Sequence, residues 1–131
     1  MPKKVSYALS MVWEYQKNNA DAKNPLTSVD LARSAGLPQR FVAQIASSLK
    51  VGGILGSREG AGGGYWLAQD WEKVSLQDLL VILGEDRRLL GCLGGEIECQ
   101  SAKQCPVRKV WERVEKVLKR ELTRINLGEI K

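Results

Sequence analysis

The sequence predicts a mainly α-helical fold that carries one small β hairpin and ends in a long helix. Three observations lead to this prediction. Apolar residues recur at intervals of three and four over much of the chain, as they do on one face of a helix. Two short strand-like runs flank a glycine-rich segment at 59–64, which is typical of a hairpin. The last apolar pattern runs from Pro106 to about Asn126 without a break, which predicts one long helix.

Residues 3–18 are expected to form the first amphipathic helix. Lys and Glu residues separate its apolar positions, so one face is predicted to be buried and the other solvated. The apolar positions are Val5, Ala8, Leu9, Val12, Trp13 and Tyr15. The polar run from Asn18 to Pro25 ends this helix as a loop.

Two shorter helices joined by a tight turn are expected next. Thr27 or Ser28 can cap the second helix, and Gly36 ends it. Pro38 suits the beginning of the third helix, where a backbone N–H has no helical partner. The inward residues are expected to be Val29, Ala32 and Ala35 in the second helix and Phe41, Val42, Ile45 and Leu49 in the third. The outer face of the third helix is expected to present Gln39, Arg40, Ala43, Gln44, Ser47 and Ser48.

The strand-like runs 54–58 and 65–68 follow the third helix directly. Two helices joined by a glycine-containing turn, the second with a polar outer face, are typical of a helix-turn-helix. A hairpin placed immediately after that helix is a wing. We therefore expect a winged helix-turn-helix domain at residues 1–84, which ends in a short helix capped by Ser75.

The charge distribution and the outer face of the third helix predict that this domain binds double-stranded DNA. Residues 1–60 carry eight Lys and Arg against four Asp and Glu, and the last 26 residues also carry eight against four, whereas residues 61–105 are acidic. Charge alone is equally typical of solvated helix faces, but polar side chains such as Gln44 can contact base edges. A glycine-rich wing allows close approach to the sugar–phosphate chain, and Arg58 beside it is placed to enter a minor groove. The expected DNA contacts are Ser28, Pro38, Gln39, Arg40, Gln44, Arg58, Gly62, Gly63 and Tyr65.

Three cysteines, the only ones in the chain, lie in the glycine-containing segment 85–105. Cys92, Cys99 and Cys105 cannot all pair within one chain because their number is odd. Thiolates at short spacing can hold a soft metal or an iron–sulfur cluster, and this spacing does not supply the Cys-x2-4-Cys pairs that zinc favours. They could also be three unrelated small apolar residues. We expect a cluster-binding loop that senses a signal.

Residues 106–131 are expected to form a dimerisation helix and tail. A near-heptad apolar stripe consists of Val107, Val110, Trp111, Val114, Val117, Leu118, Leu122 and Ile125. Such a stripe can pack on its own domain or on the same helix of a second copy, and we favour the homodimer. A two-fold dimer also suits a palindromic operator.

Several classes of protein are disfavoured. The chain has no histidine and no recognisable nucleophile with a base, so we do not expect an enzyme. The glycine-rich segment lacks the Gly-Lys-Ser/Thr ending of a phosphate-binding loop. No signal peptide or long apolar run is visible, so we expect a cytoplasmic protein without a membrane partner.

The segments Thr27–Ile45, Leu49–Arg58 and Gly60–Tyr65 resemble the winged-helix repressors typified by IscR, NsrR and RirA. The cysteine loop and the terminal helix fit the same family, so the resemblance spans nearly the whole chain. It implies a homodimeric transcription regulator, with a repressor expected. It also implies that Cys92, Cys99 and Cys105 ligate the iron of an iron–sulfur cluster whose state controls DNA affinity. The alternatives are a regulator controlled by thiol redox or by a partner protein, and an iron–sulfur redox protein that uses the winged domain for protein contacts.

The sequence departs from the family pattern at three positions. Members with a 2Fe–2S cluster have a histidine where this chain has Arg108, and nitric-oxide-sensing members have an aspartate where it has Ser6. The wing arginine of the family is replaced by Glu59, with Arg58 one residue earlier. Three thiolates without that histidine favour a 4Fe–4S cluster over 2Fe–2S. Its fourth ligand could be Glu14, Glu96, Glu98, a small thiol or water.

Overall fold

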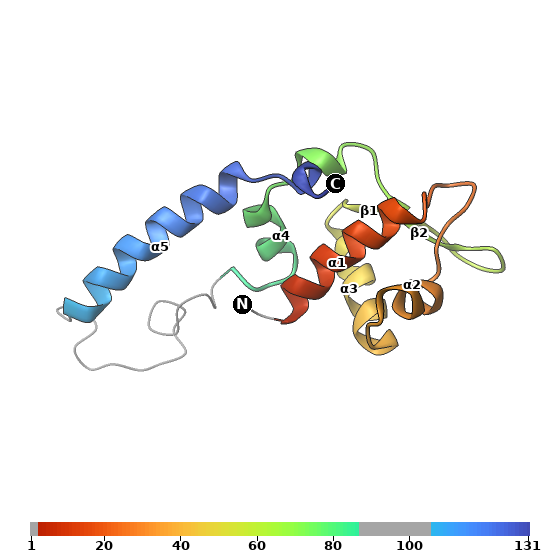
Figure 1. Cartoon of the computed structure of the whole chain (residues 1–131), viewed down its shortest axis with the longest axis horizontal. Coiled ribbons are helices and arrows are strands. Elements are labelled where there is room, and N and C mark those ends of the chain that lie inside the picture. The colour runs from red at the N-terminus through yellow and green to blue at the C-terminus, as the bar shows by residue number, and fades with distance from the viewer. Residues whose placement is uncertain (1–2, 87–105) are drawn as a thin grey trace.

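The computed structural model of the 131-residue chain describes residues 3–86 and 106–131. Helices α1, α2 and α3 form a compact group beside the β1–β2 hairpin, and α5 projects from this body (Figure 1). The elements are α1 (Lys3–Lys17), α2 (Ser28–Ala35), α3 (Gln39–Val51), β1 (Leu55–Arg58), β2 (Gly64–Leu67), the 3₁₀ turn η1 (Trp71–Lys73), α4 (Leu76–Ile82), α5 (Pro106–Arg124) and the 3₁₀ turn η2 (Leu127–Glu129). The predicted mainly helical fold with a small β wing is confirmed.

One core joins α1, α2, α3, β1 and α4, and we call this body the head. Its fully buried side chains include Met11, Tyr15, Leu31, Val42, Ile45, Leu49, Ile54 and Leu79. The sequence placed Trp13, Val29 and Phe41 on inward faces, but all three are more than 40% exposed. In α2 the inward position belongs to Leu31, because apolar spacing indicates an amphipathic helix without fixing its rotation. Phe41 lies at the edge of the core, 6.0 Å from the Tyr7 ring between centroids.

The turn between α2 and α3 follows from the capping residues on either side of it. Thr27 caps α2, because its hydroxyl accepts the N–H of Asp30 at 3.1 Å. Gly36 ends the helix at φ 69°, in the left-handed region that favours glycine, and Leu37 N–H donates to Ala32 O. Pro38 is the residue before α3 rather than its first helical residue. The predicted helix-turn-helix is confirmed with a boundary shift of one residue.

The wing is an antiparallel hairpin whose register runs from Leu55 opposite Leu67 to Arg58 opposite Gly64. Tyr65 also forms a bridge with Leu26, in which each residue donates its N–H to the other's carbonyl at 2.9 Å. This bridge ties the wing to the segment that precedes α2. The wing is therefore attached to the head on both of its strands, since β1 follows α3 directly.

The C-terminal residues return to the head, which the sequence did not indicate. Leu76 N–H donates to Ile125 O at 2.9 Å, and Leu127 N–H donates to Val74 O at 2.8 Å. Leu127 is fully buried. Gln16 of α1 donates its side-chain amide to Ile130 O at 2.7 Å. The segment after α5 therefore packs on the head, with Leu127 in its core.

Candidate nucleic-acid interface

The outer face of α3 is exposed and contains no acidic residue. Gln39, Arg40 and Gln44 all lie on this face, as the sequence predicts. The guanidinium of Arg40 lies 5.9 Å from the centroid of the Phe41 ring, close enough for a cation–π contact. Exposed Phe41 therefore supports the arginine instead of filling the core. This face offers amide and guanidinium groups without a carboxylate that would repel phosphate.

A second group of predicted residues surrounds a hollow of about 230 Å³ between the beginning of α2 and the wing. The hollow is lined by Thr27, Ser28, Lys50, Ser57, Arg58, Glu59, Gly60, Gly63, Gly64 and Tyr65. The N-terminus of α2 carries free backbone N–H groups and a partial positive charge, which favour an anion. Lys50 adds a full charge, whereas Glu59 opposes it. Sequence reasoning missed Lys50, although its place in the last turn of α3 near the wing was a usable signal.

The wing residues have roles that differ from one another. Gly62 is exposed at the tip. A side chain at Gly63 would overlap the Arg58 carbonyl, so this turn requires glycine. Tyr65 is half-buried against the core, and its backbone N–H and carbonyl are both hydrogen-bonded to Leu26. Tyr65 therefore supports the wing at least as much as it offers a surface.

Arg58, which the sequence assigns to a minor groove, makes contacts within the chain. Its Nη1 donates to Ala22 O at 3.2 Å, and its Nη2 donates to Gly62 O at 2.7 Å. The guanidinium thus lies against the loop between α1 and α2 and against the wing tip. A groove contact by Arg58 would have to use its remaining donors or break these bonds.

Glu14 is a buried carboxylate that joins α1 to α2. It accepts a hydrogen bond from Ser34 Oγ at 2.7 Å, and Lys17 Nζ and Asn18 Nδ2 lie at 3.1 and 3.4 Å from its oxygens. The Ser34 hydrogen bond is the largest influence that lowers the pKa of Glu14, and burial opposes it. Burial also raises the pKa of neighbouring Tyr15, whose hydroxyl has no hydrogen-bond partner among the described residues. The Glu14 carboxylate is engaged within the head, so binding a cluster would require it to give up these hydrogen bonds.

The predicted cluster ligands Cys92, Cys99 and Cys105 lie outside the described residues. The described flanks are the end of α4 and Pro106, which begins α5 directly after Cys105. Within the part of the chain that the structure describes, no group of three potential metal ligands comes together. Three soft thiolate donors within fourteen residues fit the chemistry of an iron–sulfur cluster.

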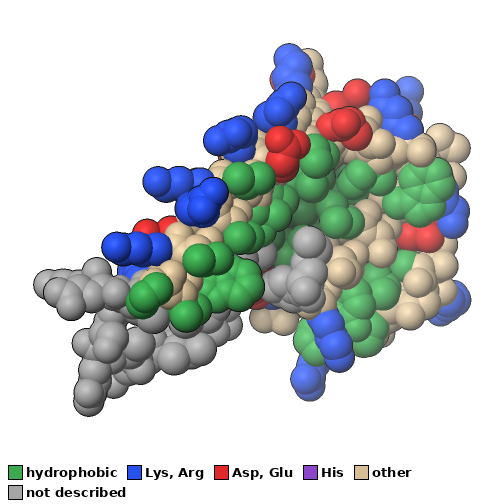
Figure 2. All heavy atoms as spheres, turned by 60° about the vertical axis from the view of Figure 1, so that its left-hand side comes forward, with side chains coloured by type: hydrophobic (Ala, Val, Ile, Leu, Met, Phe, Trp, Pro, Cys, Tyr) green, Lys and Arg blue, Asp and Glu red, His purple; other side chains and the backbone are tan. Residues whose placement is uncertain are grey.

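Among the described residues, α5 has an exposed apolar face. Figure 2 shows hydrophobic side chains gathered along one side of α5, with Lys and Arg along the other. An open groove of about 520 Å³ on this helix is lined by Val110, Arg113, Val114, Val117, Leu118 and Glu121. Val110, Val114 and Val117 are 44–58% exposed. A soluble chain rarely leaves such a continuous apolar stripe in water.

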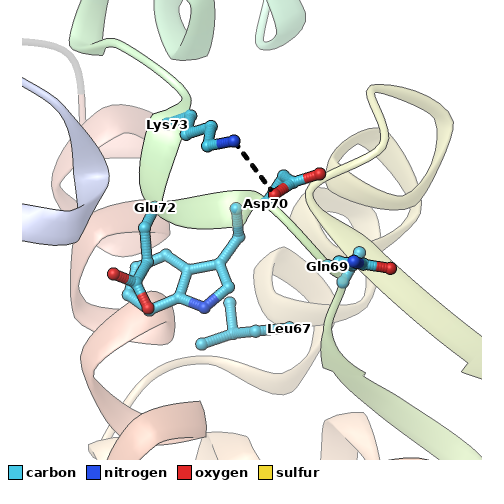
Figure 3. A pocket seen from close by; sticks show the side chains of 7 residues that line it. Leu67, Gln69, Asp70, Glu72 and Lys73 are labelled. Atoms are coloured by element: carbon cyan, nitrogen blue, oxygen red, sulfur yellow. Dashed lines mark ion pairs between the residues drawn. The ribbon is translucent and has the colours of Figure 1, made fainter.

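A further hollow of about 520 Å³ lies where β2 leads into η1 (Figure 3). Leu67 and Trp71 form its apolar wall, and Asp70 pairs with Lys73 at 3.4 Å at its edge. None of the predicted DNA or cluster residues lines it. In the described ranges, 3–86 and 106–131, no helix is long and apolar enough to cross a membrane.

The chain is similar in sequence to known regulators. IscR from Vibrio cholerae is 27% identical over 108 residues, which is 82% of this chain and 62% of that protein. A putative HTH-type regulator from Haemophilus influenzae is 27% identical over 95% of this chain and 81% of its own length. The chain thus spans less than two thirds of the length of the IscR relatives from Vibrio species.

Solved structures share the fold. CymR of B. subtilis, described as a global cysteine regulator, superposes with a TM-score of 0.73 and 22% identity over 99% of this chain and 94% of that one. IscR of T. potens gives a TM-score of 0.70 and 22% identity over 99% of this chain and 84% of that one. These relatives are transcriptional regulators, not enzymes. The Rrf2 family, described as iron-dependent transcriptional regulators, matches residues 1–131, and the chain belongs to this family.

Proposed function

We propose that the protein is a homodimeric transcription regulator that inserts α3 into the major groove of a palindromic operator. The observation that carries this proposal is the exposed, acid-free face of α3 beside the hollow at the beginning of α2. Gln39, Arg40 and Gln44 face outward from α3 and have the donors and acceptors that read base edges. Ser28 and Lys50 border the hollow, where a backbone phosphate would meet the N-terminus of α2.

The second part of the proposal is that α5 pairs with α5 of another copy. The exposed valines of α5 follow a near-heptad spacing, which is the pattern that packs one helix against another. The described chain covers only the C-terminal end of this helix, where it contacts α4. Two reading heads held by paired helices can grip two half-sites of a duplex.

The third part is that Cys92, Cys99 and Cys105 hold an iron–sulfur cluster, with 4Fe–4S favoured. The group would supply a redox- and ligand-sensitive centre between the head and α5. Arg108 stands where 2Fe–2S members carry their histidine, and its Nε donates to Glu112 at 3.2 Å, so this position serves an ion pair of α5. The proposed regulator would act as a repressor in the cytoplasm, and a change at the cysteines would alter its affinity for DNA.

Binding to DNA can be tested by separating base reading from phosphate contact. Arg40→Ala and Gln44→Ala should each weaken binding to the operator about tenfold or more, with a smaller loss on random DNA. Lys50→Ala is the matched control, since loss of a phosphate contact should weaken both DNAs equally and reduce the salt slope by about one. Equal losses on both DNAs for all three variants would contradict base reading by α3. Weak salt dependence without sequence preference would favour a protein-contact role for the winged domain.

The cluster can be tested on protein purified without oxygen. Visible absorbance with iron and sulfide analysis should show a bound cluster, and Cys92→Ala, Cys99→Ala and Cys105→Ala should each abolish its retention. A silent substitution would remove that cysteine from the ligand set. If the protein is free of iron and its operator affinity changes when the thiols are oxidised, the signal is thiol oxidation and not a cluster.

A further inference from the structure

We propose that Arg58 is a positioning residue that fixes the wing against the loop between α1 and α2, instead of serving mainly as a groove contact. This inference rests on the proposed function only where its test measures DNA binding. One guanidinium bridges two backbone carbonyls from separate segments, Ala22 in the loop and Gly62 in the wing tip. The planar fork of an arginine suits such a bridge because its donors point in fixed directions.

Both acceptors of this bridge lie in turns whose neighbouring residues are hydrogen-bonded. Asp21 Oδ1 accepts the N–H groups of Lys23 and Asn24 at 2.8 and 2.7 Å, and Asp21 N–H donates to Asn24 O at 3.2 Å. This closed turn orients the Ala22 carbonyl. In the wing tip, Gly63 N–H donates to Gly60 O at 3.0 Å.

The bridge completes the attachment of the wing to the head. The Leu26–Tyr65 pair ties the beginning of β2 to the segment before α2, and Arg58 ties the end of β1 and the tip to the loop between α1 and α2. Without the arginine, the tip would have no contact of its own with the loop between α1 and α2, and the Leu26–Tyr65 pair would be the nearest tie to the head. Because the wing and α3 must contact the duplex together, a freely moving tip would lose affinity through the entropy of ordering it.

The experiment compares two substitutions of Arg58 with two substitutions of Asp21, which holds the turn that contains Ala22. Arg58→Lys keeps the positive charge but cannot span both carbonyls, so it should lose operator affinity about as much as Arg58→Ala, roughly tenfold. Asp21→Ala opens the turn and should also weaken binding severalfold, although removal of an acid would by itself favour DNA. Asp21→Asn keeps the acceptor oxygen and removes the charge, so it should bind at least as well as the wild type.

A measurement on the free protein makes the test independent of DNA. Amide hydrogen exchange at Gly63, whose N–H donates to Gly60 O, should become faster in Arg58→Ala, Arg58→Lys and Asp21→Ala, and stay unchanged in Asp21→Asn. Wild-type affinity in Arg58→Lys with a loss in Arg58→Ala would overturn the proposal in favour of a charge contact. Unchanged exchange in all variants would also overturn it. A wild-type protein without operator preference would instead refute the proposed function and leave the exchange result to decide about Arg58.

Discussion

Helices α1 and α5 have similar lengths but are covered very differently. Six of the 15 residues of α1 are buried, whereas Leu122 is the one buried residue among the 19 of α5. Helix α1 packs against α2 and α3, and α5 contacts α4 near its C-terminal end. The difference teaches that the head forms its core within one chain, while the described residues leave an apolar face of α5 exposed, which is the face that the proposed dimer would bury.

The largest expected effect is on α5, where Val114→Glu should break the proposed dimer. A two-fold dimer would bury two unpaired carboxylates, each at a cost of several kcal/mol, so the dimer dissociation constant should rise at least about a thousandfold. Sedimentation equilibrium measures this change. Lys116→Glu, on the polar side of the same helix, is the control and should leave the dimer intact. If Val114→Glu remains dimeric, the face of α5 is not the interface.

The next largest effect is expected on stability, at Leu127 in the C-terminal segment that packs on the head. Leu127→Ala should lower the free energy of unfolding by about 2–5 kcal/mol, because Leu127 is fully buried and a cavity would remain. Val117→Ala removes a side chain that is 54% exposed in one chain and should cost far less in a monomeric background. Urea denaturation of both variants, each carrying Val114→Glu, gives the comparison. Equal losses of unfolding free energy in the two variants would contradict the placement of Leu127 in the core of the head.

A smaller effect is expected at the beginning of α4. Ser75 Oγ accepts Asp78 N–H at 3.0 Å, and Asp78 Oδ2 accepts Ser75 N–H at 3.2 Å, which is a capping box. Ser75→Ala should therefore cost about 1–2 kcal/mol of stability. Exposed Ser47 lies in the middle of α3 and caps no helix, so Ser47→Ala should be nearly neutral and serves as the control. Thermal denaturation separates the two.

The smallest effect concerns Glu14 and depends on pH. Ser34→Ala removes a hydrogen bond to the carboxylate and should cost about 1 kcal/mol at pH 7. Because the pKa of Glu14 is lowered in the folded protein, its contribution is full above its usual value of 4.5 and is lost as pH falls through the lower folded value. The difference between wild type and Ser34→Ala should therefore shrink below pH 4. A difference that is constant from pH 7 to pH 3 would contradict this account.

The order and type of the elements followed from local chemistry in the sequence. Thr27 and Ser75 marked helix starts, Gly36 marked a left-handed helix end, and the glycines at 60–64 marked the hairpin tip. These signals are readable because each depends on a few neighbouring residues. The exposed positions of Gln39, Arg40 and Gln44 also followed from the helical period of α3.

Other features were decided by the tertiary structure alone. The rotation of α2 that buries Leu31 instead of Val29 depends on what packs against it, and the return of Leu127 to the core joins residues far apart in the chain. The sequence indicated that Arg58 is free to enter a groove, but in the fold its Nη1 lies 3.2 Å from the Ala22 carbonyl oxygen. Spacing along a chain records the period of a helix or strand, but it does not record which distant carbonyl or cavity a side chain will meet. That information arises only when the segments pack.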